Sequence, residues 1–208
     1  MDRGVSSGSM PRHYFLQDLL VAQKIYKLRP TRHLDIGSRV DGLVAHIASF
    51  RNVEVADIRP MEMKVDGISF RMIDLSAQLP ADCISAFDSV SCLHALEHFG
   101  LGRYGDSIDP DGYLKGIENL ASLLCPGGSL HLSVPVGLER VEFNAHRVFS
   151  PRTIISACEN MFTLVEFSLI DDEGILARNV DILSSPHLLD GDGMNYACGI
   201  FQFQKLES

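Results

Sequence analysis

Short apolar runs that end at or beside an acidic residue recur along the chain, and this pattern constrains the fold more than any other feature. Three such runs carry Asp35, Asp57 and Asp74, and a fourth, residues 87–93, leads into Glu97. Segments with helical spacing precede the first run and separate it from the second, and another follows the fourth. Strands that alternate with helices form a parallel sheet, and α/β proteins bind ligands beyond the carboxyl ends of such strands. The four acids therefore predict a ligand site at that edge of the sheet.

Apolar periodicity predicts the elements. We expect helices over residues 13–29, 41–50, 113–124 and 151–160. We expect strands over residues 33–38, 53–57, 68–73, 87–93, 129–134, 162–169 and 197–203. Pro126, Gly127 and Gly128 predict a turn between a helix and the fifth strand. The last two strands have no clear helix between them, which favours an antiparallel closing pair. The fold class is α/β, with a seven-stranded, mostly parallel sheet, helices on both faces and an N-terminal helix packed on it.

Composition sets the domain organisation and the classes of partner. The 208 residues, 46% hydrophobic and 22% charged, predict one globular domain over residues 11–208. Residues 1–10 are rich in Gly and Ser and are expected to be disordered or tag-like. The net charge of −9 disfavours nucleic acid and anionic membranes as partners. No run approaches the ~20 apolar residues of a membrane helix. A homodimer is allowed by these data.

Cysteine usage indicates the compartment. The count is odd, and no two cysteines form a C-x-x-C pair. We expect free, partly buried thiols in a reducing cytoplasm, at Cys83, Cys92, Cys125, Cys158 and Cys198.

Six strings stand in a fixed order along the chain. They are HLDIGS (33–38), VADIRP (55–60), MIDLS (72–76), SCLHALEHFG (91–100), LLCPGGSLHLSVP (123–135) and HRVFSPRTI (146–154). In this order they resemble the motifs of class I S-adenosylmethionine-dependent methyltransferases. The resemblance implies a Rossmann-like fold, S-adenosyl-L-methionine as cofactor and methyl transfer as the activity.

A narrower resemblance rests on four longer strings. They are HYF followed by QDLLVA (13–22), HLDIGSRVDG (33–42), EHFGLGRYGD (97–106) and VEFNAHRVFSP (141–151). They resemble a bacterial family of uncharacterised methyltransferase-like proteins, over residues 13 to about 203. The resemblance implies a small-molecule or glycan-type acceptor, with surface-polysaccharide biosynthesis as an associated setting.

The resemblance also implies residue roles. Asp35, Gly37 and Ser38 would shape the loop under the methionine part of the cofactor, Asp57 and Ile58 would hold the ribose, Asp74 and Leu75 would contact the adenine, and Leu93 would border the methyl group. A carboxylate suits a ribose diol because it accepts several hydrogen bonds. Asp74 can also be a turn residue, since DLS favours turns, and Asp57 can be a solvated strand-end acid.

Methyl transfer to a hydroxyl group benefits from a general base, and histidine is the usual choice near neutral pH. The candidate catalytic residues are His94, His98 and His146, although each can instead be a structural histidine. Arg147, with Arg140 nearby, is a candidate clamp for an anionic acceptor.

The segment from residue 102 to residue 112 carries three acids in six positions. Such a group could bind a hard cation. A polar substrate-facing or lid loop is the interpretation we prefer, because the EF-hand spacing is not met. We expect no metal.

The glycine loop departs from the pattern of the resembling family at Arg39 and Asp41. A cation at Arg39 would lie near the space of the cationic cofactor. This departure supports a second hypothesis, a catalytically silent binding or scaffold protein that retains the fold. A third hypothesis, a nicotinamide-dependent oxidoreductase, shares the acid after the second strand. It needs a G-x-G-x-x-G run, which is absent.

Overall fold

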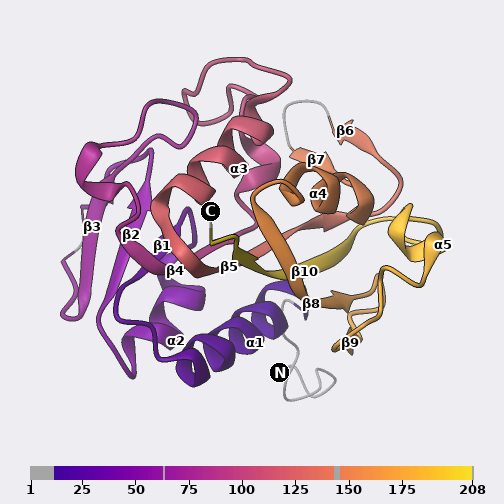
Figure 1. The fold of residues 1–208 in the computed structure, drawn as a ribbon, viewed down its shortest axis with the longest axis horizontal. Helices are drawn as coiled ribbons and strands as arrows, with labels where there is room; N and C mark the ends of the chain where they lie inside the picture. The colour runs from indigo at the N-terminus through magenta and orange to yellow at the C-terminus, as the bar shows by residue number, and fades with distance from the viewer. Residues whose placement is uncertain (1–11, 63, 143–145, 208) are drawn as a thin grey trace, which may run out of the picture.

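A computed structural model describes residues 12–62, 64–142 and 146–207, and Figure 1 shows the arrangement. Residues 1–10, expected to be disordered or tag-like, lie outside the described residues. The helices are α1 (Arg12–Leu28), α2 (Ala45–Ala48), α3 (Gly112–Leu123), α4 (Pro151–Cys158) and α5 (Pro186–Leu189). The strands are β1 (His33–Ile36), β2 (Val53–Asp57), β3 (Ile68–Met72), β4 (Phe87–Leu93), β5 (Leu124–Val136), β6 (Arg140–Glu142), β7 (His146–Val148), β8 (Phe162–Ile170), β9 (Leu176–Ala177) and β10 (Ala197–Lys205).

One sheet organises the chain, with strand order β3-β2-β1-β4-β5-β10-β8-β9. The first five strands of this order pair in parallel, and β10 runs antiparallel to both β5 and β8. All seven predicted strands are present, and so is the antiparallel closing pair. The two-residue β9 at the edge and the separate β6–β7 hairpin were not predicted. The predicted α/β class with a mostly parallel core is confirmed.

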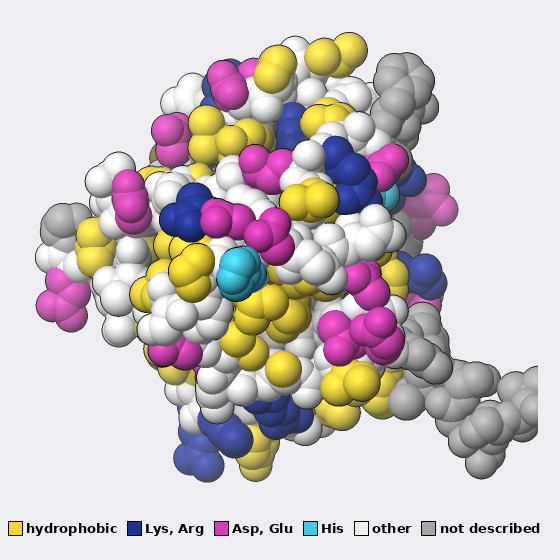
Figure 2. Space-filling view, turned by 90° about the vertical axis from the view of Figure 1, so that its right-hand side faces the viewer, with side chains coloured by type: hydrophobic (Ala, Val, Ile, Leu, Met, Phe, Trp, Pro, Cys, Tyr) yellow, Lys and Arg dark blue, Asp and Glu magenta, His cyan; other side chains and the backbone are white. Residues whose placement is uncertain are grey.

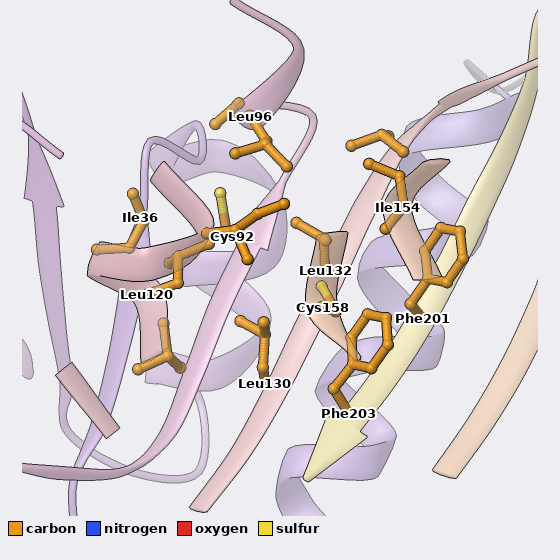
Figure 3. Packing of buried hydrophobic residues seen from close by; sticks show 14 of the residues in the cluster. Ile36, Cys92, Leu96, Leu120, Leu130, Leu132, Ile154, Cys158, Phe201 and Phe203 are labelled. Atoms are coloured by element: carbon orange, nitrogen blue, oxygen red, sulfur yellow. The ribbon is translucent and has the colours of Figure 1, made fainter. Parts of the chain in front are cut away.

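Side-chain alternation divides the sheet into two different faces. Leu34, Ile36, Val90 and Cys92 point to the face covered by α3 and α4 and belong to the larger apolar core. Figure 3 shows this packing, with side chains of β1, β4, β5 and β10 meeting Leu120 of α3 and others from α4. Because the side-chain period of a strand is two, the intervening residues must face α1 and α2.

The face under α1 carries a buried polar layer in addition to its apolar contacts. Its sheet residues are His33, Asp35, Ser89, Ser91, Ser129, His131 and Ser133, each at most 9% exposed. Gln17 of α1 accepts a hydrogen bond from Ser133 Oγ at 2.7 Å, and Lys24 donates to Gln202 at 3.0 Å and pairs with Glu166 at 2.5 Å. Hydrogen bonds of this kind offset the cost of burying the polar groups that make them. These bonds fix how α1 sits on the sheet.

Two predicted boundaries differ from the structure. β5 begins at Leu124 and runs through the predicted turn at Pro126, Gly127 and Gly128. Gly127 has φ +74° and the register with β4 shifts there, so the P-G-G run is an irregularity within a strand. The predicted helix over residues 41–50 begins as a π-helical turn, Val40–Val44, kinked at Gly42, before α2.

All five cysteines are free thiols, and four of them are buried. Among the described residues, no helix combines the length and the apolar character needed to cross a membrane. Figure 2 shows the face that carries α5 and β9, where acidic and basic side chains are interspersed with apolar ones.

His131 predicts a measurable pH dependence of stability. Burial, followed by the charge of Lys24, lowers the pKa of His131 to about 3, and neither ring nitrogen has a hydrogen-bond partner among the described residues. Below pH ~6.5 the imidazole of His131 therefore binds a proton in the unfolded chain but stays neutral in the folded chain. The free energy of unfolding consequently decreases as the pH falls from ~6.5 toward ~3. In His131→Leu this loss should shrink by up to about 1.4 kcal/mol per pH unit. Urea unfolding at pH 7 and about pH 5 measures it.

His187→Leu is the matched control, because the His187 side chain is 90% exposed. The control should keep the wild-type slope. Equal slopes for His131→Leu and the wild type would contradict the burial of a neutral His131.

Candidate functional site

A cleft lies at the carboxyl ends of β1, β2, β3 and β4. Its lining combines apolar walls with convergent polar groups, a combination typical of ligand sites. The lining residues are Ile36, Gly37, Asp57, Ile58, Arg59, Ile73, Asp74, Leu75, Ser76, His94, Ala95, His98, Phe99, Tyr104 and Asp106. This is the sheet edge at which the sequence predicts a site.

Gly37 allows the loop after β1 to approach the end of β4. It has φ +72°, and a Cβ added there would lie 2.9 Å from the Cβ of Ala95. Its N–H donates to the carbonyl of Ala56 on β2 at 2.8 Å. A residue with a side chain would be strained here and would meet Ala95. Glycine therefore joins three strand ends at the floor of the cleft.

Asp35 lies beneath this loop and does not line the cleft. It is fully buried, and its Oδ1 accepts hydrogen bonds from Ser38 Oγ at 2.9 Å and Ser91 Oγ at 2.5 Å. Its Oδ2 has no hydrogen-bond partner among the described residues. Burial raises the pKa of Asp35 to about 6. The hydrogen bond to Ser38 ties Asp35 to the loop after β1, and the role of both residues under a cofactor stays a prediction.

Asp57 lines the cleft beside Ile58, and Arg59 donates hydrogen bonds to the Asp57 carboxylate. Arg59 donates from its backbone N–H and Nε to Oδ1, at 2.8 and 2.9 Å, and from Nη2 to Oδ2 at 2.7 Å. Burial would raise the pKa of Asp57, but these bonds lower it below its usual value. The Arg59 guanidinium also lies 4.6 Å from the ring centre of Tyr104. Sequence reasoning missed Arg59 and Tyr104, although Arg59 stands in the VADIRP string.

Asp74 and Leu75 line the cleft, whereas Leu93 does not. Asp74 Oδ1 accepts from the N–H and Oγ of Ser76, at 2.8 and 2.6 Å, which is also the turn role considered for it. Leu93 is buried in the apolar cluster beneath α1. The alternation of β4 explains this, since Leu93 shares a face with Ser89 and Ser91.

The three candidate histidines gather around Glu97. His94 and His98 line the cleft, and Glu97 Oε1 lies 3.1 Å from His94 Nδ1 and 3.8 Å from His98 Nε2. His146 of β7 does not line the cleft, but its ring centre lies 6.3 Å from that of His98. Its pKa is lowered, chiefly by burial. The sequence thus predicted histidines that the fold brings together.

The predicted anion clamp is wrong, because both arginines are occupied by the protein itself. Arg147 is 6% exposed and donates to the carbonyls of Phe99 at 2.6 Å and Pro110 at 3.0 Å. Arg140 pairs with Glu142 at 2.6 Å and donates to the carbonyl of Asn195. Arg147 therefore holds the loop before α3.

That loop, residues 100–112, forms one wall of the cleft through Tyr104 and Asp106. Asp106 accepts hydrogen bonds from the N–H groups of Gly100, Gly102 and Tyr104, at 2.8, 3.2 and 3.1 Å. Asp109 pairs with Lys115 at 2.5 Å. The described residues contain no cluster of metal-ligating side chains. Asp106 thus orders the backbone of the loop, and the lid interpretation stays a prediction.

Arg39 does not place a cation in the cleft, contrary to what its position in the glycine loop predicts. Its side chain is 83% exposed and pairs with Asp41, with Nη2 2.7 Å from Oδ2. Neither residue lines the cleft. The altered glycine loop therefore turns its charges to solvent, and the arginine at the cleft is Arg59.

Comparison with solved structures identifies the class of fold. The N-methyltransferase NodS from Bradyrhizobium japonicum WM9, in complex with S-adenosyl-L-homocysteine, shares 16% identity at a TM-score of 0.61, covering 94% of this chain and 88% of that chain. The 1,6-didemethyltoxoflavin-N1-methyltransferase of Burkholderia thailandensis, with bound 1,6-didemethyltoxoflavin and S-adenosylhomocysteine, shares 15% sequence identity at a TM-score of 0.62. The match covers 92% of this chain and 79% of that chain. The (4+2)-cyclase SpnF shares 13% sequence identity at a TM-score of 0.62, and the match covers 92% of this chain and 82% of that chain. The fold is that of class I S-adenosylmethionine-dependent methyltransferases.

The family follows from a sequence model. The model described as Caenorhabditis protein of unknown function, DUF268, matches residues 45–171, and the chain belongs to this family. The comparison with curated proteins gives no significant match. The narrower resemblance to a bacterial methyltransferase-like family stays a prediction.

Replacing Arg147 should loosen the wall of the cleft. Lysine keeps the charge of Arg147 but cannot reach two carbonyl groups with a planar fork of donors. Arg147→Lys should lower the free energy of unfolding by about 2 kcal/mol. It should also speed amide hydrogen exchange at Asp109 and Gly112, whose N–H groups bond within the loop. Denaturant unfolding and exchange mass spectrometry measure the two effects.

Arg152→Lys serves as the control, since Arg152 is half-exposed and its side chain pairs with Asp190 at the surface. Its unfolding should change by less than about 0.5 kcal/mol. If the amide hydrogens of the loop exchange in Arg147→Lys at the rate of the wild type, Arg147 does not hold the loop in place.

Proposed function

We propose that the protein transfers a methyl group from S-adenosyl-L-methionine to a small or sugar-like acceptor. The observation that carries the proposal is a cleft at the predicted strand ends that joins Gly37, Asp57, Asp74 and two histidines within a class I methyltransferase fold. Both methyltransferases named above have S-adenosylhomocysteine in their structures. A setting in surface-polysaccharide biosynthesis follows from the sequence resemblance alone.

The residues of the cleft fit such a cofactor. A carboxylate has about four acceptor positions, and of the three hydrogen bonds from Arg59 to Asp57 only one goes to Oδ2, so this oxygen is the one that would meet a ribose hydroxyl. Ile58, Ile73 and Leu75 offer an apolar wall for a planar base. Gly37 keeps the floor clear of a side chain, and Asp35 Oδ2, which has no hydrogen-bond partner within the described part of the chain, supplies negative charge beneath the loop. This polarity suits a cationic ligand.

In this proposal the chain contributes mainly positioning. Asp57 would bind a ribose hydroxyl, Leu75 would pack on the adenine, and Gly37 would let the methionine part pass close to the backbone. When bound, S-adenosylmethionine supplies an electrophilic methyl group on a sulfonium. His94 and His98 border the space beside Ala95 and would face the acceptor. Holding donor and acceptor in line accounts for much of the rate of such a displacement.

A catalytically silent binding or scaffold protein is the alternative. The contact of Arg59 with both oxygens of Asp57 favours it, because the arginine occupies most of the acceptor capacity that a ribose diol needs. The (4+2)-cyclase SpnF also shares the fold, so the fold does not by itself establish methyl transfer.

Asp57→Ala should weaken binding of S-adenosylmethionine and S-adenosylhomocysteine by about 1–3 kcal/mol. This is the scale for losing hydrogen bonds to a charged group. Isothermal titration calorimetry of the full chain with each ligand measures the change. Wild-type affinity in Asp57→Ala would contradict the ribose role of Asp57.

Asp82→Ala is the matched control, because Asp82 also pairs with an arginine, Arg71 at 2.6 Å, but does not line the cleft. It should bind both ligands as the wild type does. If the wild-type protein binds neither ligand at millimolar concentration, the enzyme proposal is wrong and the scaffold alternative holds.

A further inference from the structure

A groove lies between α1 and α2, and it shares no residue with the cleft. Its apolar walls come from Leu19, Ala22 and Tyr26 of α1 and from Phe50, which follows α2. Tyr26 is 57% exposed and Phe50 is 38% exposed, and their rings meet edge to face with centres 5.3 Å apart. Aromatic side chains that stay in water at a concave surface are typical of a docking site.

The rim of this groove is positive, although the chain has a net charge of −9. Lys27 lines the groove, and Arg29 comes just after the end of α1. Both residues are exposed, and neither forms an ion pair with any residue that the structure describes. Other surface arginines are paired with acids of the chain, as Arg39 is with Asp41. The groove therefore has positive charge left for a partner.

The two segments that form this surface contain no acid. Neither residues 19–34 nor residues 42–53 include an Asp or a Glu. The acids that flank these segments are buried or paired with arginines, and they are Asp18, Asp35, Asp41 and Glu54. Opposite charge across an interface steers the partner and fixes its register, whereas apolar contact supplies affinity. The groove therefore fits a segment that carries both carboxylates and apolar side chains.

A membrane or a nucleic acid matches this surface less well. A cation near an anionic membrane contributes only about 1 kcal/mol, and binding to nucleic acid draws on many phosphate contacts. Lys27 and Arg29 are few for either task, and the net charge of −9 opposes both. An acidic protein segment is the partner that the charges favour.

The chain carries a segment of this kind itself. Residues 171–196 lead from β8 to β10 and contain six acids against one cation, Arg178. Two aliphatic side chains of this segment are left in water, Ile175 at 65% exposure and Leu183 at 63%. Figure 2 shows this face, where acidic side chains are interspersed with apolar ones. The segment thus combines the two features that the groove requires of an occupant.

The segment of one molecule does not reach the groove of that same molecule. It begins beside the first turn of α1, where His13 Nε2 lies 3.2 Å from the carbonyl oxygen of Asp171. Tyr26 comes 13 residues after His13, which is about 20 Å farther along a helix. Figure 1 accordingly shows α5 and β9 on a different side of the molecule from α2. Each surface can therefore meet the other only between two molecules.

We propose that the groove between α1 and α2 binds residues 171–196 of a second copy of this chain. Lys27 and Arg29 face acids of that segment, while Ile175 and Leu183 pack on the two aromatic rings. Reciprocal contacts of this kind close a dimer, and one-way contacts build a ring or a row of copies. The inference is independent of the proposed function, because the groove shares no residue with the cleft.

Sedimentation velocity of the full chain tests the proposal. Over about 1–200 μM chain at low salt, the weight-average mass should rise above that of one copy. Salt at about 0.5 M should reduce this rise, because it screens exposed charges. A wild-type chain that keeps the mass of one copy over the whole range would overturn the proposal.

Charge reversal at the groove separates this contact from a general effect of charge. Lys27→Glu should weaken association at least about 10-fold, because like charges across an interface repel each other. Lys64→Glu is the matched control, since Lys64 is exposed, lies outside the groove and gives the same change in net charge. Equal weakening by the two variants would overturn the role of the groove.

The acidic segment has a matched pair of variants of its own. Ile175→Lys/Leu183→Lys replaces both exposed aliphatic side chains with cations, and should also weaken association at least about 10-fold. Met72→Lys/Ile84→Lys makes a similar change at positions that are 68% and 48% exposed and lie outside both surfaces, and should associate as the wild type does. Wild-type association of Ile175→Lys/Leu183→Lys would overturn the role of the segment.

Mixing the two defective variants tests the pairing directly. Lys27→Glu retains an intact segment, and Ile175→Lys/Leu183→Lys retains an intact groove. Neither should associate alone, but an equal mixture should form pairs that stop at two chains, which also shows that both variants are folded. If the mixture stays at the mass of one copy while each variant keeps the wild-type circular dichroism spectrum, the groove does not bind this segment.

Other occupants give a different result. A single-copy wild type could bind a synthetic peptide rich in Glu and Leu, or phosphatidylserine vesicles, and lose that binding in Lys27→Glu. Fluorescence anisotropy and vesicle co-sedimentation measure the two cases. Either outcome would assign the groove to another acidic protein or to a membrane, and would overturn the second copy as its occupant.

Discussion

The cleft depends on one buried guanidinium, that of Arg147. Its fork of donors binds carbonyl groups at both ends of the loop over residues 100–112, and the ring of Tyr113 lies 5.4 Å away. The loop then presents Tyr104, on which Arg59 lies, and Arg59 in turn holds Asp57. A chain of contacts thus runs from β7 to the end of β2. The separate sequence strings around these residues are parts of one wall.

The acidity of the chain has two physical roles. Asp35 and Glu97 are acids that the fold removes from water and holds at the strand ends, so they act on the cleft through a medium of low polarity. Asp41 and Asp82 are surface acids paired with arginines and screened by solvent. The net charge counts both kinds equally. Only the buried acids act strongly on the charge of a ligand in the cleft.

Local pattern was sufficient to place the strands and their terminal acids, because burial and alternation are encoded within a few residues. Gly37, Asp57, Asp74 and His98 could be assigned to the cleft for this reason. The direction of long side chains could not be read in the same way. Arg39 and Arg59 both follow a strand-end acid, yet Arg39 pairs in solvent while Arg59 lies in the cleft. Phe99, one of the partners of Arg147, lies 48 residues away from it in the sequence, and no local pattern marks this contact.

The place of β10 in the sheet has a consequence for the order of assembly during synthesis. β10 lies between β5 and β8, so the strand of this sheet that comes last in the sequence is the one that joins β8 to the parallel core. Until residues 197–205 leave the ribosome, β5 presents an open hydrogen-bonding edge and β8 has only β9 beside it. Open edges of this kind invite pairing with other chains. The nascent chain is therefore exposed to association until its final strand arrives.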